Sequence, residues 1–227
     1  MSSNDNFILE RGHVMEGRSI KIHAPTSKKV SLKVIPGHFA TSHSHINLYI
    51  DLTATKSRLS EASEAARMMS MQYINNVVID SIVCLDNCEV IGGFLAQELT
   101  AAGILSMNAH KTMYIIPPEY NTNGQMIFRD CNQGAIFNKK VLLLVASITT
   151  GDTIRRSLEA IKYYGGEVNG ISAIFSAVDE VDGIKVYSIF RKKDLPDYQS
   201  YNTNECPLCR TGQKLDAIVN GYGYMKI

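Results

Sequence analysis

One stretch of the chain indicates its fold class: Val141-Leu-Leu-Leu-Val-Ala-Ser-Ile-Thr-Thr-Gly-Asp-Thr-Ile-Arg-Arg-Ser157. It opens with the longest unbroken apolar run of the chain, Val141 to Ala146, which predicts a strand buried on both faces. Thr149-Thr150-Gly151 then predicts a short loop, and the residues after it begin an amphipathic helix. A buried strand that passes through a short loop into a helix is the repeating unit of a parallel α/β sheet.

The same alternation of apolar runs and helices continues on both sides of this stretch. The helix that it opens ends at Gly165-Gly166, a common stop signal. This order predicts an α/β fold with a mostly parallel sheet flanked by helices. Strands are expected at 77–84, 113–116, 140–146, 168–177 and 184–190, and helices at 89–102 and 153–164.

Outside this core the patterns are shorter. The first ~20 residues are polar and are expected to form a loosely held start. Val30–Ile35 alternates and predicts a strand that ends in a turn at Pro36-Gly37, and 46–52 predicts a second strand. Helices are expected over 56–73, which is rich in Ala, Glu and Met, and over 214–219.

Composition limits the classes of function. The 227 residues are 45% hydrophobic, enough for one large domain or a domain with a small appendage. The formal net charge of +1 leaves no cationic excess to neutralise the phosphates of nucleic acid, so nucleic acid is not an expected partner. No apolar run approaches the ~20 residues of a membrane span, and no export signal is visible. We therefore expect a cytoplasmic protein without membrane association, whose 5 cysteines are reduced thiols or metal ligands.

The Thr/Gly loop is a candidate phosphate site. A helix N-terminus presents unpaired N–H groups and the positive end of the helix dipole to an anion. Hydroxyl groups and a glycine that permits close approach would complete the cradle, although one acidic residue would have to turn outward. A plain helix cap made of Thr and Asp is the other interpretation. The residues concerned are Thr149, Thr150, Gly151, Asp152 and Thr153.

Cysteine and histidine residues suggest a metal site. Cys206-Pro-Leu-Cys209 has the spacing of a zinc knuckle, which supplies half of a tetrahedral site. His43 and His45 are alternate residues of a strand-like segment, so both imidazoles would face one way and complete the site. Alternatively, Cys206 and Cys209 are reduced thiols in a turn, and the two histidines line a ligand pocket.

The part of the chain around the Thr/Gly loop resembles the phosphoribosyl pyrophosphate loop of type I phosphoribosyltransferases. In both, a strand is followed by a Thr-Thr-Gly-x-Thr loop, by a helix that ends in Gly-Gly, and by a further strand. Phe39–Leu52, with its small-residue turn and Tyr-x-Asp-Leu strand, is similar to the N-terminal segment of the orotate phosphoribosyltransferases, and the Ile91-Gly-Gly-Phe94 helix start follows in the expected order. The resemblance covers 37–190. It implies three parts: an N-terminal segment and hood over 1–73, a phosphoribosyltransferase-like core over 74–195, and a Cys-x-x-Cys extension over 196–227.

The resemblance also implies roles for particular residues. The five loop residues would hold a 5′-phosphate, and Arg155 would hold the carboxylate of the base, unless it is a solvated residue beside Arg156. No catalytic residue is assigned directly. Asp86 and Glu89, in the loop after the strand at 77–84, are the candidates for a role linked to Mg²⁺.

The chain departs from the family pattern at two places. The family normally has two adjacent acids that hold the ribose hydroxyls, and Val145 and Ala146 stand at those positions. The family's orotate enzymes also have a mobile loop rich in Lys, whereas the corresponding 119–125 contains no Lys, Arg or His.

Two functions follow from the resemblance and its departures. The first is transfer of ribose 5-phosphate from phosphoribosyl pyrophosphate to a pyrimidine base, with Mg²⁺, by a homodimer in nucleotide metabolism. The second is a non-catalytic regulatory protein that binds phosphoribosyl pyrophosphate or a nucleotide monophosphate on the same scaffold. A third interpretation, from the Cys-x-x-Cys motif, is a structural Zn²⁺ protein in which the sheet only supports the C-terminal knuckle.

Overall fold

The computed structural model describes residues 17–101, 103, 106–109 and 111–227, so most of the expected polar start lies outside the described residues. Contacts divide the chain into two compact units. The central unit is Ala54–Pro196, and the terminal unit joins the described residues 17–53 to Asp197–Ile227. The three-part division expected from the sequence stays a prediction.

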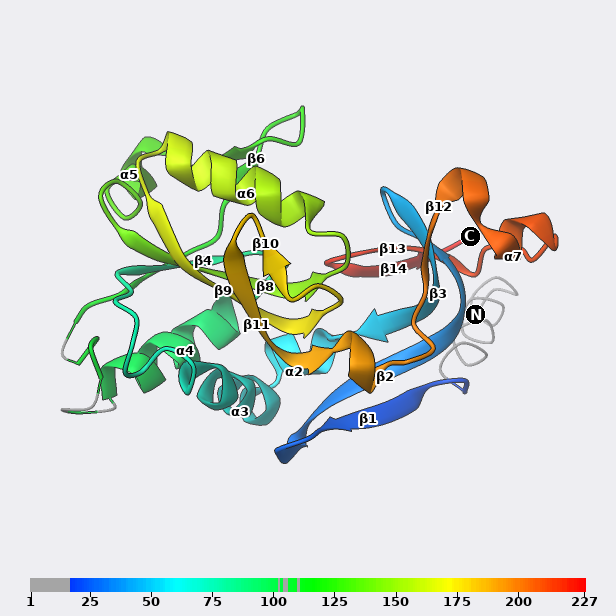
Figure 1. The fold of residues 1–227 in the computed structure, drawn as a ribbon, viewed down its shortest axis with the longest axis horizontal. Helices are drawn as coiled ribbons and strands as arrows, with labels where there is room; N and C mark the ends of the chain where they lie inside the picture. Colours follow the sequence, from blue (N-terminus) through cyan, green and yellow to red (C-terminus); the bar gives the residue numbers. More distant parts are fainter. Residues whose placement is uncertain (1–16, 102, 104–105, 110) are drawn as a thin grey trace, which may run out of the picture. The chain divides into compact units, whose positions relative to one another are not determined.

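The central unit is built on a parallel sheet (Figure 1). Its strands lie in the order β10-β11-β9-β8-β4-β5, and only β10 is antiparallel to its neighbour. The predicted α/β class, a mostly parallel sheet flanked by helices, is confirmed. The strands are β4 (Ser81–Cys84), β5 (Tyr114–Ile116), β8 (Lys140–Ile148), β9 (Glu167–Ser176), β10 (Glu180–Val181) and β11 (Ile184–Arg191).

Helices cover both faces of this sheet. In Figure 1, α6 (Asp152–Tyr163) lies over one face, and α3 (Leu59–Ser70) and α4 (Glu89–Ala101) lie over the other. Strand residues that alternate toward α6, such as Leu143, pack in one apolar cluster with Ile154 of that helix. Burial on both sides explains why the strands are near-continuous apolar runs. The unit also contains α2 (Thr53–Ser57), α5 (Asp130–Gln133) and the hairpin of β6 (Glu119–Tyr120) and β7 (Met126–Ile127).

The strand order places a topological switch point between β4 and β8. From β4 the chain crosses to β5 on one side, and it then returns to β8 on the other side of β4. The two connections leave the sheet in opposite directions at the carboxyl ends of β4 and β8. Open α/β sheets bind ligands in a crevice at such a point, so the ligand crevice is expected there.

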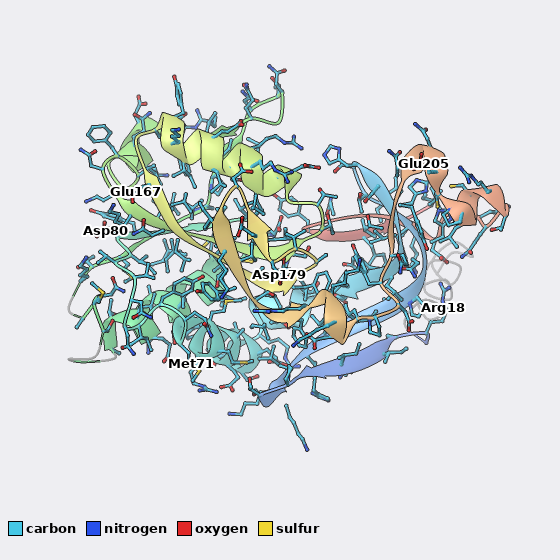
Figure 2. The ribbon with its side chains drawn as sticks, viewed as in Figure 1. Arg18, Met71, Asp80, Glu167, Asp179 and Glu205 are labelled. Atoms are coloured by element: carbon cyan, nitrogen blue, oxygen red, sulfur yellow. The ribbon has the colours of Figure 1, made fainter. Side chains whose placement is uncertain are left out.

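At the amino-terminal ends of the strands of this sheet, Asp80 directly precedes β4 and joins it to its neighbours (Figure 2). Its N–H donates to the Lys140 carbonyl at 2.8 Å, and its carboxylate accepts the Lys140 N–H at 2.9 Å. The Tyr114 N–H donates to the Asp80 carbonyl at 3.1 Å. One residue therefore aligns the starts of three strands.

The terminal unit is a mainly antiparallel sheet made from both ends of the described chain. Its order is β12-β3-β2-β13-β14, with β1 also paired to β2, and β13 runs parallel to β2. A short helix, α7 (Pro207–Arg210), lies between β12 and β13. The strands are β1 (Ile20–Ala24), β2 (Ser27–Ala40), β3 (Ser44–Asp51), β12 (Ser200–Asn202), β13 (Ala217–Asn220) and β14 (Gly223–Lys226).

Three local predictions are wrong. The predicted turn at Pro36-Gly37 lies inside β2, at a shift of register between Pro36 and Phe39 that has the form of a β-bulge. The helix expected over 56–73 is two helices, because Arg58 is extended between them. The helix expected over 214–219 is mostly β13, whose Ala217 and Val219 are buried in strand alternation. Among the described residues, no helix is long and apolar enough to cross a membrane.

Candidate functional site

The loop between β8 and α6 turns at a left-handed glycine that directly precedes the helix. Gly151 has a φ of 87°, in the left-handed region, and a side-chain carbon added there would lie 3.1 Å from Val181 Cγ2. Its carbonyl accepts the Arg155 N–H at 2.9 Å, which closes the first turn of α6. The N–H groups at the first positions of α6 have no partner within the helix, and that of Asp152 lies 3.5 Å from the Thr150 hydroxyl. Thr149 is half-buried, and Thr150 and Thr153 are exposed.

Asp152 is neutralised by its neighbours. One of its carboxylate oxygens accepts the Thr150 hydroxyl at 2.8 Å, and the other accepts Arg155 Nη1 at 2.7 Å. Arg155 also lies 3.3 Å from Asp182. The Asp152 carboxylate is thereby held by one guanidinium and one hydroxyl, which lowers its repulsion of a bound anion. Arg155, the residue expected at the base carboxylate, is paired with these two acids.

Asp86 is the most unusual residue of the crevice. It follows β4 with a φ of 54°, and its carboxylate accepts the N–H groups of Ala146 and Ser147 at the end of β8. Lys56 is buried and donates to the Asp86 carbonyl at 2.9 Å. Burial raises the pKa of the Asp86 carboxyl, and the charge of Lys56 and the two N–H groups oppose that rise. Asp86 thus links the two loops that flank the switch point.

Val145 and Ala146 occupy the positions where the resemblance leads us to expect acids. Val145 is 2% exposed and belongs to the apolar cluster beneath α6. Ala146 is 3% exposed, and its N–H donates to Asp86. The end of β8 therefore contributes packing and backbone N–H groups, and the carboxylate at this place comes from the neighbouring loop.

The other expected residues of the central unit lie on separate features. Glu89 is half-buried and is the first residue of α4. The segment 119–125 forms part of the β6–β7 hairpin, where Glu119 pairs with Arg129 at 2.7 Å. An open groove of about 710 Å³ lies between this hairpin and α6, and its described lining includes 123–125 of this segment but none of the Thr149–Thr153 loop.

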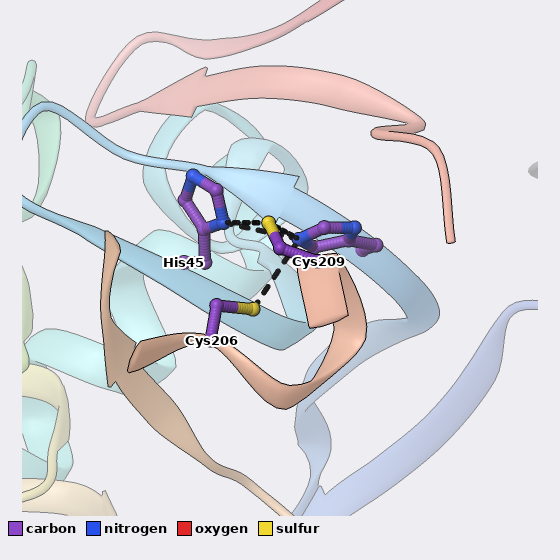
Figure 3. A group of neighbouring side chains, drawn as sticks. His45, Cys206 and Cys209 are labelled. Atoms are coloured by element: carbon purple, nitrogen blue, oxygen red, sulfur yellow. Dashed lines mark hydrogen bonds between the residues drawn. The ribbon is translucent and has the colours of Figure 1, made fainter. Parts of the chain in front are cut away.

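Both cysteines of the Cys-x-x-Cys motif meet a histidine pair in the terminal unit (Figure 3). Cys209 Sγ lies 3.2 Å from His45 Nδ1, and both sulfurs lie near His38 Nε2. Within the described residues, the group that could hold a metal ion is His38, His45, Cys206 and Cys209. His43 is exposed and precedes β3, so strand alternation does not place it beside His45. His38 takes the position that had been expected for His43.

Sequence reasoning missed two residues of these sites. His38 could not be identified as a candidate ligand from the sequence, because the direction of its side chain depends on the bulge in β2. The neighbouring Pro36-Gly37 pair could have indicated an irregularity in the strand. Lys56 was expected only as the first residue of the helix over 56–73.

Burial and the neighbouring His38 hold the pKa of His45 below its usual value, which favours the neutral imidazole that binds metals.

The fold defines an α/β protein whose topological switch point lies between β4 and β8, at the carboxyl ends of the strands. No family model matches the chain. It is 25% identical over 189 residues to the orotate phosphoribosyltransferase of Chlorobium phaeobacteroides, covering 81% of this chain and 88% of the relative. The resemblance to type I phosphoribosyltransferases is thus confirmed at a distant level.

Two other relatives match shorter parts. The orotate phosphoribosyltransferase of Caldanaerobacter subterraneus is 32% identical over 76 residues, which is 33% of this chain and 38% of that protein. The transcriptional regulator GfcR of Picrophilus torridus is 25% identical over 107 residues, 46% of this chain and 54% of the regulator. The match thus spans little more than a third of one relative and about half of the other.

Proposed function

We propose that this chain binds 5-phosphoribosyl pyrophosphate at the crevice between β4 and β8, and transfers ribose 5-phosphate to a nitrogenous base. Orotate is the base we expect. The single observation that carries the proposal is the position of the Thr149–Thr153 loop, which opens α6 at the topological switch point of the sheet. The similarity to orotate phosphoribosyltransferases supports the choice of ligand.

The loop is suited to the 5′-phosphate. Exposed N–H groups at the start of α6, the hydroxyls of Thr149 and Thr153, and the left-handed Gly151 present donors to one anion. Asp152 is bound by Thr150 and Arg155, so the cradle retains the favourable end of the helix dipole. For Arg155 to contact the base carboxylate, that carboxylate would have to compete with Asp152 and Asp182.

Asp86 is the candidate for the role of the missing acidic pair. Its carboxylate lies against the N–H groups of Ala146 and Ser147, at the end of the strand where the family has its acids. From there it would accept hydrogen bonds from the ribose hydroxyls. Asp86 and Glu89 are the carboxylates that would hold Mg²⁺ together with substrate phosphates, and a cation held there would supply positive charge for the leaving pyrophosphate.

The transfer breaks the bond between ribose C1′ and the pyrophosphate oxygen and forms a bond from C1′ to the base nitrogen. Pyrophosphate leaves with the electron pair of the broken bond, so stabilising its charge is the main electrostatic task. In this chain the candidate group is the ammonium of Lys56, which is buried and donates to the Asp86 carbonyl.

A second function, a non-catalytic sensor of the same ligands, is favoured by Val145. This side chain is part of the apolar core, so no acid stands at that position to hold the ribose from β8. The similarity to the regulator GfcR supports this candidate. It predicts binding of a nucleotide or of phosphoribosyl pyrophosphate without turnover.

Calorimetry and an absorbance assay separate the two candidates. The full chain is titrated with phosphoribosyl pyrophosphate, orotate and orotidine 5′-monophosphate in the presence of Mg²⁺, and loss of orotate is followed in parallel. Binding with turnover supports the transferase, and binding without turnover supports the sensor. If none of the three ligands binds, the assignment of the crevice is refuted.

Asp86→Asn tests the catalytic assignment within the same assay. We expect turnover to fall by about 100-fold while the affinity for the phosphorylated ligand changes by less than about 3-fold, since one carboxylate is removed but the phosphate loop is not. Asp130→Asn is the matched control, because it also removes an acid from the central unit but is an exposed residue at the start of α5, outside the loops after β4 and β8. Assembly as a homodimer is a further expectation, which light scattering measures.

A further inference from the structure

The cluster of His38, His45, Cys206 and Cys209 joins segments that are far apart in sequence. His38 lies at the bulge of β2 and His45 lies on β3, whereas the two cysteines flank the first turn of α7. All four residues belong to the terminal unit. Their ligand atoms lie within 4.8 Å of one another, and three of the four residues are buried.

The distances match those around a tetrahedral metal ion. With Zn–N bonds of about 2.05 Å and Zn–S bonds of about 2.3 Å, a tetrahedral site separates two nitrogens by about 3.3 Å and a nitrogen from a sulfur by about 3.6 Å. The His38 Nε2 to His45 Nδ1 distance is 3.1 Å. The distances from Cys206 Sγ and Cys209 Sγ to His38 Nε2 are 3.5 and 3.7 Å, and Cys209 Sγ lies 3.2 Å from His45 Nδ1.

Hydrogen bonding alone does not account for this arrangement. His38 Nδ1 lies 2.8 Å from the Gln213 carbonyl, which can only accept, so Nδ1 carries the proton and Nε2 has a lone pair. His45 Nδ1, Cys206 Sγ and Cys209 Sγ all approach that single lone pair. One lone pair satisfies one donor, whereas a cation at the centre satisfies all four groups.

The surroundings orient the ligands. The bond from His38 Nδ1 to the Gln213 carbonyl is the contact by which metal-binding histidines are commonly held in the correct tautomer. Asp216 fixes the backbone of His38, because its carboxylate accepts the His38 N–H at 2.9 Å and its own N–H donates to the His38 carbonyl at 2.7 Å. Gln213 and Asp216 both lie in the segment that follows the Cys-x-x-Cys turn.

We propose that His38, His45, Cys206 and Cys209 bind one Zn²⁺ in a closed tetrahedral site that fastens the segment between β12 and β13 to β2 and β3. Two thiolates and two imidazoles are a structural zinc set, and four protein ligands leave no position for a substrate. The ligand softness and geometry favour Zn²⁺ over Mg²⁺ or Ca²⁺.

Metal analysis of the full chain, purified without chelator or added metal, is the first test. We expect about one zinc per chain, and an X-ray absorption spectrum with two sulfur and two nitrogen neighbours at about 2.3 and 2.0 Å. Replacement by Co²⁺ should give the intense visible bands of tetrahedral thiolate coordination. These measurements need no variant, so they hold even where a substitution prevents folding.

Substitutions with matched controls identify the ligands. His38→Ala and Cys209→Ser should reduce zinc to below about 0.2 per chain, because a structural site needs its full set. His43→Ala and Cys131→Ser should keep it, since His43 and Cys131 are exposed and stand outside the cluster. Zinc retained by His38→Ala, or lost equally by His43→Ala, would overturn the ligand assignment.

A redox alternative has a distinct readout. If Cys206 and Cys209 form a disulfide in the purified protein, the intact mass falls by two hydrogens and no zinc is bound. That result, or a chain that is metal-free with the same melting temperature with and without added zinc, refutes the site. Activity in the crevice enters none of these measurements.

Discussion

Replacing Gly151 by alanine tests the phosphate loop most directly. The residue has a φ of 87°, where a side chain is strained, and the added carbon would lie 3.1 Å from Val181 Cγ2. The left-handed conformation costs about 1–2 kcal/mol for a residue other than glycine. The close contact with a buried side chain adds about 1 kcal/mol. We therefore expect a loss of about 2–3 kcal/mol.

Gly183→Ala is the matched control. Gly183 also has a left-handed φ, 80°, but a carbon added there meets nothing within 4 Å. It should lose about 1–2 kcal/mol, the backbone contribution alone. The difference between the two variants isolates the contact with Val181.

The two variants should differ in melting temperature and in ligand affinity. For the roughly 140 residues of the central unit, the entropy of unfolding is about 0.3 kcal/mol/K, so Gly151→Ala should melt about 8 °C lower and Gly183→Ala about 5 °C lower. Affinity for phosphoribosyl pyrophosphate should fall at least about 10-fold in Gly151→Ala, because the backbone N–H groups are displaced, and stay within about 2-fold in Gly183→Ala.

Scanning calorimetry and isothermal titration give both quantities. Equal melting temperatures for the two variants would refute the packing argument. Unchanged affinity in Gly151→Ala would refute the role of the loop, even if the stability loss is as expected.

Other substitutions in the central unit test packing and charge. Gly170→Ala would place a carbon 2.7 Å from Tyr73 Cε1, inside the core. The free energy of unfolding, measured by urea titration, should fall by about 1–3 kcal/mol. A stability close to that of the unchanged protein would refute the tight contact. Burial raises the pKa of Asp86, so the native state holds this proton at a pH where the unfolded chain has released it, and stability should fall as pH rises above about 4. Asp86→Asn should remove this slope from the urea midpoints, and an unchanged slope would contradict the assignment. Burial alone would raise the pKa of Asp80, but the Lys140 N–H and a lysine side chain hold it below its usual value. The stability from Asp80 should therefore be present above about pH 4 and lost as pH falls below it, and Asp80→Ala should cost about 1–3 kcal/mol at pH 7 by thermal unfolding.

The core of the fold could be predicted from local patterns, because each buried strand is a continuous apolar run. The run at 140–146 became β8, and the helix expected over 153–164 became α6 with its bounds shifted by one residue. The segment 214–219 was mistaken for a helix because six residues do not separate a period of 3.6 from a period of 2. Its pairing with β2, nearly the whole chain away, makes it a strand.

The candidate sites were predictable only in part, for the same physical reason. The Thr149–Thr153 loop and the Cys-x-x-Cys pair are contiguous motifs, so spacing alone indicates their chemistry. His38 depends on a bulge in β2, and the contact of Asp86 with β8 depends on a hydrogen bond between loops. Such contacts between distant residues are set by tertiary structure, which a single sequence does not display.

The terminal unit also has a consequence for synthesis on the ribosome. Its sheet pairs β2 with β13, and its cysteines follow the whole central unit in the chain. The central unit is complete once Pro196 has emerged, and it can fold while the last strands are still being made. Residues 20–51 can then form only part of their sheet, because β12, β13 and β14 have not yet been synthesised. The terminal unit is therefore the last to fold. A truncated product that lacks about the final thirty residues would keep the loops after β4 and β8 but expose an unpaired strand edge, a feature that favours aggregation.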